Sequence, residues 1–113
     1  MTQLPEWRRP KQAIAEIRKA KLTVDEVTRL TELMSRFRSD RTLPKDHKRL
    51  RDGVEELRLF GDRRDFRLYF GRIEGGLVLL LLHFNAKKKD NDGDAIDLAA
   101  DRLKRWRDQA DVT

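Results

Sequence analysis

The sequence contains no cysteine, which excludes disulfide scaffolds, thiolate zinc sites and cysteine nucleophiles together. It also lacks a long hydrophobic run, because the longest, Leu77–Leu82, is far too short to cross a bilayer. The N-terminal segment has no apolar stretch of the signal-peptide type. Glycine-rich phosphate loops, dinucleotide fingerprints and Ser/His/Asp signatures are missing as well. These absences predict a cytoplasmic protein and give no reason to expect a cofactor.

Residues that bind metal ions are equally scarce. His47 and His83 are the only histidines, and they stand 36 positions apart in a chain without cysteine. The acidic run at Asp90, Asp92 and Asp94 lacks both the spacing and the closing glutamate of a calcium-binding loop. We therefore expect no metal site.

Positive charge is what the 113 residues have in abundance. Lysine and arginine number 26 against 20 acidic residues, the net charge is +6, and 17 of the 26 basic residues are arginine. A small arginine-rich domain indicates a polyanionic partner, usually nucleic acid, because the planar guanidinium pairs with phosphate through two hydrogen bonds. A GC-rich genome and a solvated surface would give the same composition, so composition alone leaves both interpretations open. The length predicts one domain.

Helical periodicity dominates the first third of the chain. Apolar residues at helical spacing predict a helix over Trp7–Lys21. Only a first turn tolerates Pro10, so we expect this helix to start near Arg8 or Arg9. A second helix is predicted over Val24–Arg38, and Thr23 with Glu26 forms a capping box at its start. The short link between the two helices predicts an antiparallel helix hairpin.

After a loop over Ser39–Leu50 the periodicity changes to two, which predicts strands. The predicted strands are Val54–Phe60, Asp65–Ile73 and Leu77–Phe84. The last is apolar on both faces, so we expect a central strand with antiparallel neighbours and cover on both sides. The expected fold class is α+β: a helix hairpin (about 7–38) on a twisted antiparallel sheet (about 53–84), followed by a C-terminal helix over about Asp94–Gln109.

Basic residues concentrate in two stretches of the sequence. The segment Arg36–Arg51 contributes +5 of the net charge, and the run Lys87–Lys89 follows the last predicted strand. Such stretches bind phosphates when they border one face of a sheet, although lysine runs in loops are more often simply solvated. The candidate RNA-binding residues are Lys45, Lys48, Arg49, Arg51 and Lys89.

Two arginines stand in the middle of predicted strands. Arg58 and Arg67 lie on the polar faces of adjacent strands, where antiparallel pairing brings them together. A strand arginine is often paired with a neighbouring carboxylate, here Glu55 or Glu56, and this interpretation stays open beside phosphate binding.

His83 ends the apolar strand next to the lysine run. Its ordinary pKa suits a general acid or base at neutral pH. A buried, hydrogen-bonded structural histidine is at least as good an interpretation of the same position.

Three motifs in register resemble the RelE/ParE superfamily of type II toxins, and most of all its phage-derived, HigB-like branch. They are Leu50–Arg58, Phe66–Phe70 and Leu79–Lys88, similar to L-x-D-G-hydrophobic-x-E-L-R, R-V-x-Y-F and L-L-H-x-F-x-K-K of that branch. Order, spacing and size agree over His47–Asp108, a little over half of the chain. Family members usually open with a β-strand, whereas Met1–Trp7 is short and contains Pro5, so we expect a reduced edge strand.

The resemblance implies a helical hairpin on one side of a twisted sheet and a concave basic face on the other. Many family members cut mRNA on the ribosome by promoting attack of the ribose 2′-hydroxyl on the adjacent phosphate, and others poison DNA gyrase. Each is held inactive by a co-encoded antitoxin, in the HigB-like branch a helix-turn-helix DNA-binding protein. The implied partners are therefore a cognate antitoxin and mRNA on the ribosome, without a membrane.

The first hypothesis is accordingly a ribosome-dependent mRNA interferase. Arg58 and Arg67 would stabilise the charge of the transition state, and His83 or a lysine of the 87–89 run would act as the base. Tyr69 would orient an RNA base or donate a proton. The candidate catalytic residues are Arg58, Arg67, Tyr69, His83, Lys87 and Lys88. A gyrase-poisoning toxin and a non-catalytic phage-derived binding protein are the alternatives.

Overall fold

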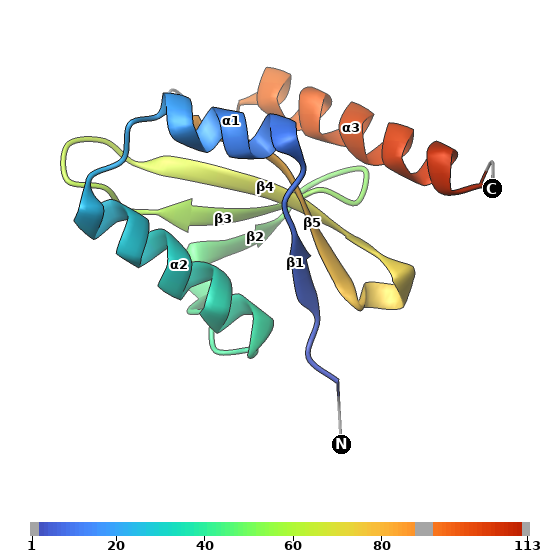
Figure 1. Cartoon of the computed structure of the whole chain (residues 1–113), viewed down its shortest axis with the longest axis horizontal. Helices are drawn as coiled ribbons and strands as arrows, with labels where there is room; N and C mark the ends of the chain where they lie inside the picture. The colour runs from blue at the N-terminus through green and yellow to red at the C-terminus, as the bar shows by residue number, and fades with distance from the viewer. Residues whose placement is uncertain (1–2, 88–91, 112–113) are drawn as a thin grey trace.

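The computed structural model of the chain describes residues 3–87 and 92–111 (Figure 1). The elements in chain order are β1 (Glu6–Arg8), α1 (Lys11–Lys19), α2 (Val24–Arg38), the 3-10 turn η1 (Pro44–Asp46), β2 (His47–Arg49), β3 (Glu55–Leu59), β4 (Phe66–Ile73), the 3-10 turn η2 (Glu74–Gly76), β5 (Val78–Ala86) and α3 (Gly93–Asp111). The fold class is α+β, as the sequence predicts. Within the described ranges, no helix is long and apolar enough to cross a bilayer.

The five strands form one sheet in the order β1-β5-β4-β3-β2. Strands β3 to β5 form the predicted antiparallel meander, which β2 extends, but β1 pairs with β5 in parallel, so the expectation of antiparallel neighbours on both sides of the apolar strand is wrong. A hairpin connection would have fixed an antiparallel direction, and β1 has no such connection to β5. The middle position belongs to β4, with β5 beside it.

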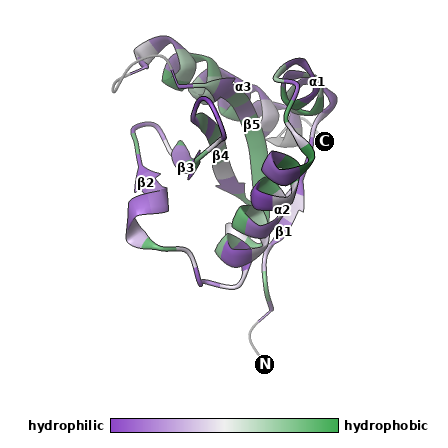
Figure 2. Cartoon of the chain, turned by 90° about the vertical axis from the view of Figure 1, so that its left-hand side faces the viewer, coloured by the Kyte–Doolittle hydropathy of each residue, from purple (hydrophilic) through white to green (hydrophobic). Residues whose placement is uncertain are grey.

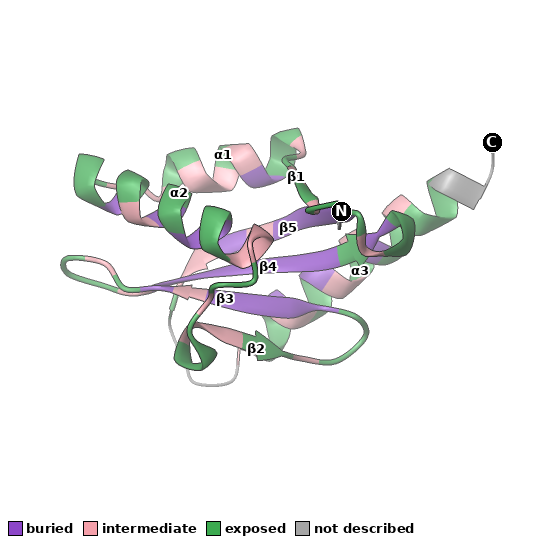
Figure 3. Cartoon of the chain, turned by 90° about the horizontal axis from the view of Figure 1, so that it is seen from below, coloured by how far each residue is buried: buried purple, intermediate pink, exposed green. Residues whose placement is uncertain are grey.

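The helices cover both faces of the sheet, so the molecule has two cores (Figure 3). We call the face under α1 and α2 the hairpin face, and the opposite face the α3 face. On β5, Leu79 and Leu81 belong to the core of the hairpin face, whereas Leu80 and Leu82 belong to that of the α3 face. The prediction that this apolar run is covered on both sides is therefore confirmed, and Figure 2 shows it as a hydrophobic strand between α1 and α3.

The start of α1 differs from the prediction. The helix begins at Lys11 with Pro10 as its N-cap, and Trp7 with Arg8 lies in β1 instead of in the helix. Proline suits this boundary because a helix start leaves backbone N–H groups unbonded in any case. Trp7 is held in the strand by its indole Nε1, which donates to the carbonyl oxygen of Met34 at 2.8 Å. The expected reduced edge strand is thus present as three residues.

The second helix has the predicted bounds. Both halves of the capping box are present, since the Glu26 N–H donates to the Thr23 hydroxyl and the Thr23 N–H donates to the Glu26 carboxylate. The Thr23 hydroxyl also donates to Asp62 in the turn between β3 and β4. The cap therefore ties the start of α2 to the end of the β3–β4 hairpin.

The sequence pattern does not predict strand β2, because this strand is short and charged. The predicted loop over Ser39–Leu50 contains β2, which pairs with the start of β3. The connecting turn has Asp52 at φ 57° and Gly53 at φ 78°, with the Val54 N–H donating to the Arg51 carbonyl. Two left-handed residues in the order Asp-Gly form a tight hairpin turn, and this dipeptide was the available signal for β2.

The C-terminal helix packs closely on β4. Gly71 lacks a side chain where α3 crosses the sheet, and a Cβ atom there would lie 2.9 Å from the Leu103 side chain. The ladder between β4 and β5 shifts register between Tyr69 and Phe70. Ala99 and Leu103 of α3 are buried against the sheet. Among the described residues α3 contacts β4 and β5 but not β3.

Candidate nucleic-acid interface

The residues predicted to act on phosphate come from three neighbouring strands. Arg58 of β3 lies opposite Arg67 of β4, and Arg67 lies opposite Asn85 of β5. One row further along, Tyr69 lies opposite His83. Because opposite residues of an antiparallel ladder share a face, the structure brings four predicted catalytic residues into two adjacent rows.

Glu56 lies opposite Tyr69 in the second row, and its carboxylate reaches both arginines of the first row. Its Oε1 lies 3.1 Å from Nε of Arg58 and 3.2 Å from Nε of Arg67. The side chains of Glu56 and Arg67 are only 3% and 4% exposed, whereas that of Arg58 is 38% exposed. One carboxylate therefore faces two guanidinium groups, and the excess positive charge is presented to solvent through Arg58.

Arg67 does not lie on an open polar face as the alternation of its strand predicts. It is buried, and its pairing with Glu56 matches the carboxylate interpretation that the sequence left open. A guanidinium in such a position needs a carboxylate because an unpaired buried charge is very costly.

Tyr69 is also buried, which corrects the expectation that it shares an accessible face with Arg67. It is fully enclosed in the core under α3, and its ring stacks on that of His83 with 5.8 Å between centroids. Burial raises the pKa of the Tyr69 hydroxyl, although the neighbouring Arg67 opposes the change. The hydroxyl is therefore neutral, and α3 separates it from any ligand at the surface.

His83 is held in an ion-pair network at the side of the sheet. Its Nδ1 lies 2.8 Å from Oε2 of Glu16 on α1, and Nη1 of Arg102 on α3 lies 3.0 Å from both oxygens of the same carboxylate. The His83 side chain is 13% exposed. This geometry supports the structural interpretation of His83 more than the catalytic one.

The same network closes an open edge of β5. Strand β1 pairs only with Val78, Leu79 and Leu80, so the rest of β5 has no neighbouring strand on that side. There Arg102 donates to the carbonyl of Leu82 at 2.7 Å, and the Phe84 N–H points to Glu16 at 3.4 Å. The side chains of Arg102 and Glu16 thus bond backbone groups of β5 that a neighbouring strand would otherwise bond. Neither was singled out from the sequence, although Glu16 interrupts the apolar stripe of its helix.

The predicted RNA-binding residues are distributed over both faces. Lys48 lies opposite Glu56 in the β2–β3 ladder and so joins the face of Arg58, whereas Arg49 lies opposite Glu55 and points to the other face. Both side chains are exposed. Lys48 and Arg58 are therefore the accessible cations beside Glu56.

The remaining candidates contribute less to this surface. Arg51 pairs with Asp52 and with Asp97 of α3, which compensates its charge. The Lys45 ammonium lies 5.7 Å from the centroid of the Phe60 ring. Lys87 is exposed directly after β5, where its N–H donates to the Asp65 carbonyl at 2.8 Å. Lys88 and Lys89 lie outside the described residues.

A second buried carboxylate, Glu55, was considered only as an alternative partner for the strand arginines. Its carboxylate accepts two hydrogen bonds from Arg72, from Nε at 2.8 Å and from Nη2 at 3.2 Å. Nε2 of His47 lies 2.9 Å from Oε1 of the same carboxylate. Burial raises the pKa of Glu55, but the hydrogen bonds from Arg72 and His47 outweigh burial and hold that pKa below its ordinary value. No sequence signal identifies Arg72 as the partner, because the two residues meet diagonally across the β3–β4 ladder.

Comparison with known proteins does not identify the family of the chain, because no protein-family model and no curated protein matches it. In the part of the chain that the structure describes, no group of three His, Cys, Asp or Glu side chains could hold a metal ion. The arrangement at Glu56 is suited to binding a phosphate through Arg58, with Lys48 beside it.

Proposed function

We propose that the chain is the toxin of a type II toxin-antitoxin system, and that it cleaves mRNA on the ribosome. The observation that carries the proposal is the pairing of Arg58 with Arg67 around one carboxylate, which leaves a guanidinium positioned and exposed for a phosphate. The three motifs of the family resemblance coincide with β3, β4 and β5, so they contribute to one surface and not to scattered loops. Both facts support a site built for a phosphodiester.

In the proposed reaction the ribose 2′-oxygen attacks the adjacent phosphorus and the 5′-oxygen leaves. Arg58 stabilises the charge that develops on the phosphoryl oxygens, and Lys48 holds a neighbouring phosphate. Arg67 has a structural role, because its guanidinium lies buried beside Glu56, the carboxylate that orients Arg58. Lys87 serves as the base in this proposal, since its side chain is exposed directly after β5 whereas that of His83 is only 13% exposed.

The partners belong to the same proposal. A basic toxin that acts on translating ribosomes requires an inhibitor, and an antitoxin of opposite charge would associate quickly through electrostatic attraction. We expect this antitoxin to be a small helix-turn-helix DNA-binding protein that covers Arg58 and Lys48. The expected place of action is the cytoplasm.

One observation favours a second candidate, a toxin that acts by binding alone, on gyrase or on another target. Tyr69 is enclosed beneath α3, and His83 is engaged by Glu16, so two of the predicted catalytic groups are not offered to a substrate. A binding protein would need only the exposed cations and no acid or base.

A reconstituted translation reaction with purified protein distinguishes the two candidates. Cleavage of the mRNA, mapped by primer extension to sites inside the translated frame, supports the interferase. Arg58→Ala should lower the cleavage rate on the order of 10²–10³-fold. Arg18→Ala removes the same charge from an exposed position on α1 and should leave the rate unchanged.

Other outcomes contradict the proposal. Intact mRNA together with inhibited DNA supercoiling by gyrase would identify the binding toxin. An Arg58→Ala protein that folds normally and cleaves at the full rate would remove Arg58 from the site.

A further inference from the structure

A basic recess lies at the opposite end of β4 from Arg67. Two adjoining hollows, of about 270 and about 450 Å³, share Arg72 and Arg107 in their walls. The first extends to Arg49, and the second extends to η2 and Trp106. We call the two hollows together the Arg107 recess. None of its functional groups takes part in the proposed cleavage.

Arg107 is fixed in place but uncompensated. Its Nη2 donates to the carbonyl of Arg72 at 3.2 Å, at the edge of β4 that β3 leaves unpaired. Among the described residues no carboxylate forms an ion pair with it. A guanidinium anchored by a carbonyl keeps its full charge, and its other N–H groups remain available as donors.

Arg72, the second cation of the recess, is also held rigidly. It pairs with Glu55 through two hydrogen bonds and lies 5.4 Å from the centroid of the Phe37 ring. Positively charged side chains outnumber carboxylates in and around the Arg107 recess. Glu55, Glu74 and, near Arg72, Asp40 face Arg8, Arg49, Arg72 and Arg107 in and around the recess, an excess of one positive charge.

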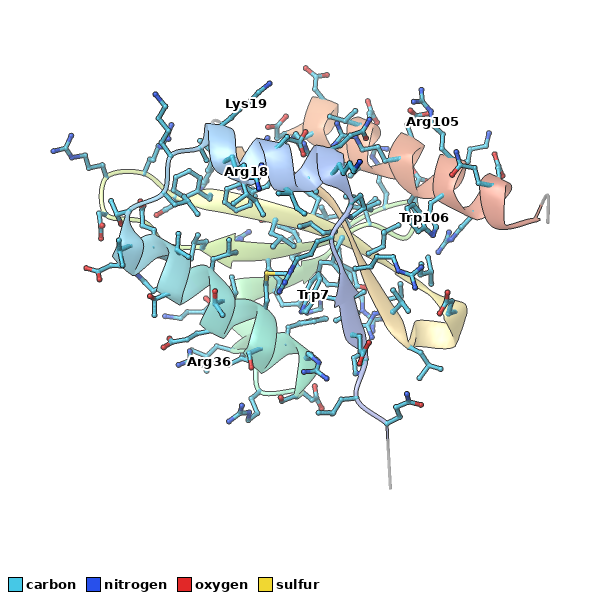
Figure 4. All side chains as sticks on the ribbon, viewed as in Figure 1. Trp7, Arg18, Lys19, Arg36, Arg105 and Trp106 are labelled. Atoms are coloured by element: carbon cyan, nitrogen blue, oxygen red, sulfur yellow. The ribbon has the colours of Figure 1, made fainter. Side chains whose placement is uncertain are left out.

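Trp106 gives the recess an aromatic wall. Figure 4 shows Trp106 under α3 on the side of the β4–β5 hairpin, while Arg105, its neighbour in sequence, points away from the sheet. The Arg8 guanidinium carbon lies 5.7 Å from the centroid of the Trp106 ring. Because Trp106 lines the recess, the NMR signal of its indole N–H should change when a ligand binds there.

We propose that the Arg107 recess binds a phosphate group, and that it does so independently of the proposed cleavage. The excess of positive charge suits a phosphate, and an arginine fork pairs with two phosphate oxygens in parallel. The phosphate belongs either to an RNA strand or to a small phosphorylated molecule, because both offer the same oxygens. Arg72 lies five positions after Arg67 on β4, roughly 16 Å of strand, so the recess and the Glu56 cluster bind different phosphates.

The test follows the backbone amides of the recess, the Trp106 indole N–H and the Arg107 Nε–H by two-dimensional ¹⁵N NMR. One titration uses pyrophosphate and the other a short single-stranded RNA. The signals of the recess should move with either probe, and added salt should weaken the binding. Shifts with RNA alone identify a strand as the source of the phosphate, and shifts with pyrophosphate alone identify a small molecule.

Variants decide whether the recess is responsible. Arg107→Ala should weaken binding about tenfold or more, because it removes a charge-assisted contact. Arg105→Ala removes the same charge two residues earlier on the outer side of α3 and should leave the affinity unchanged. Arg49→Ala, at a side chain that is 80% exposed, should also weaken binding and does not endanger the fold. Two results overturn the proposal: absence of shifts with both probes, or Arg107→Ala and Arg49→Ala proteins that bind as tightly as the unmodified protein.

Discussion

Glu56 shows how a single residue links stability to the proposed site. Its carboxylate is nearly inaccessible, yet it faces two guanidinium groups. Removing one partner from a buried ion pair is strongly destabilising, because the other charge stays in the interior uncompensated. Arg67 contacts Glu56 in the interior, whereas the side chain of Arg58 is 38% exposed and is solvated without Glu56. The same substitution therefore has different consequences at the two arginines.

We predict that Glu56→Gln lowers the free energy of unfolding by about 3 kcal/mol, because it removes the buried negative charge that faces both Arg58 and Arg67. Arg67→Ala should also destabilise, and its toxicity should fall only as far as the folded fraction falls. Urea unfolding beside a growth assay measures both effects. Glu32→Gln, at an exposed side chain on α2, is the matched control and should change stability by less than about 0.5 kcal/mol. An Arg67→Ala protein of normal stability that is no longer toxic would show that Arg67 contacts the RNA itself.

Glu55 predicts a dependence of stability on pH. Its pKa is lowered in the folded protein, mainly because Arg72 and His47 outweigh the effect of burial. A lowered carboxyl pKa contributes stability above the unfolded value of about 4.3, and this contribution is lost as the pH falls through the folded value. Glu55→Gln should therefore flatten the acid limb of a plot of Tm against pH. An acid limb as steep as in the unmodified protein would assign the effect to other carboxylates.

At the scale of the element, α3 is fastened to the sheet on both sides of its apolar stripe. Arg102 donates to the Leu82 carbonyl at the open edge of β5, and Arg107 donates to the Arg72 carbonyl at the open edge of β4. Between them Leu103 packs on Gly71. Unpaired edges of a sheet invite association with other strands, and side chains that occupy the edge prevent it. The helix thus protects two edges while it covers Tyr69.

Replacing Arg102 with Ala should open the edge of β5. It removes the partner of Glu16 and the donor to Leu82, so we expect a loss of about 2 kcal/mol in unfolding free energy. Amide hydrogen exchange at Phe84 should become faster than in the unmodified protein. Arg105→Ala on the same helix breaks only an exposed pair with Asp101 and should do neither. Unchanged exchange at Phe84 would show that other contacts close the edge.

The elements also show what periodicity can and cannot predict. Helix α2 and the three long strands follow from runs long enough to establish a period, and Thr23 marks the start of α2. Strands β1 and β2 have three residues each, too few to show alternation, and only the Asp52-Gly53 turn indicated the second. The alternation placed Arg58 and Arg67 side by side correctly.

The accessibility of the candidate site could not be predicted in the same way. Whether a residue is exposed depends on what crosses its strand, and α3 covers Tyr69 while its Leu103 packs on Gly71, two residues further along the same strand. The network of Glu16, His83 and Arg102 joins three elements that are distant in sequence. No local pattern encodes such a meeting.

At the scale of the whole molecule, the net charge of +6 would attract RNA even without a site. Solvent-accessible arginines occur on both sides of the sheet, at the exposed Arg18 of α1 and at the partly exposed Arg58 of β3. Affinity alone therefore does not separate a defined interface from a generally basic surface. The dependence of affinity on salt does, because each phosphate neutralised by a cation releases its counterions.

We predict that binding of single-stranded RNA weakens with salt and that the slope depends on the face. For a single strand, log affinity falls with log salt by about 0.7 per phosphate contacted. Arg58→Ala should reduce the slope by about 0.7, and the double variant with Lys48→Ala by about 1.4, because each removes one contact on the α3 face. Arg18→Ala lowers the net charge equally but should leave the slope unchanged. Fluorescence anisotropy from about 50 to about 200 mM salt measures the slopes. Equal reductions for Arg18→Ala and Arg58→Ala would mean that the molecule binds RNA through its overall charge and not through the surface around Glu56.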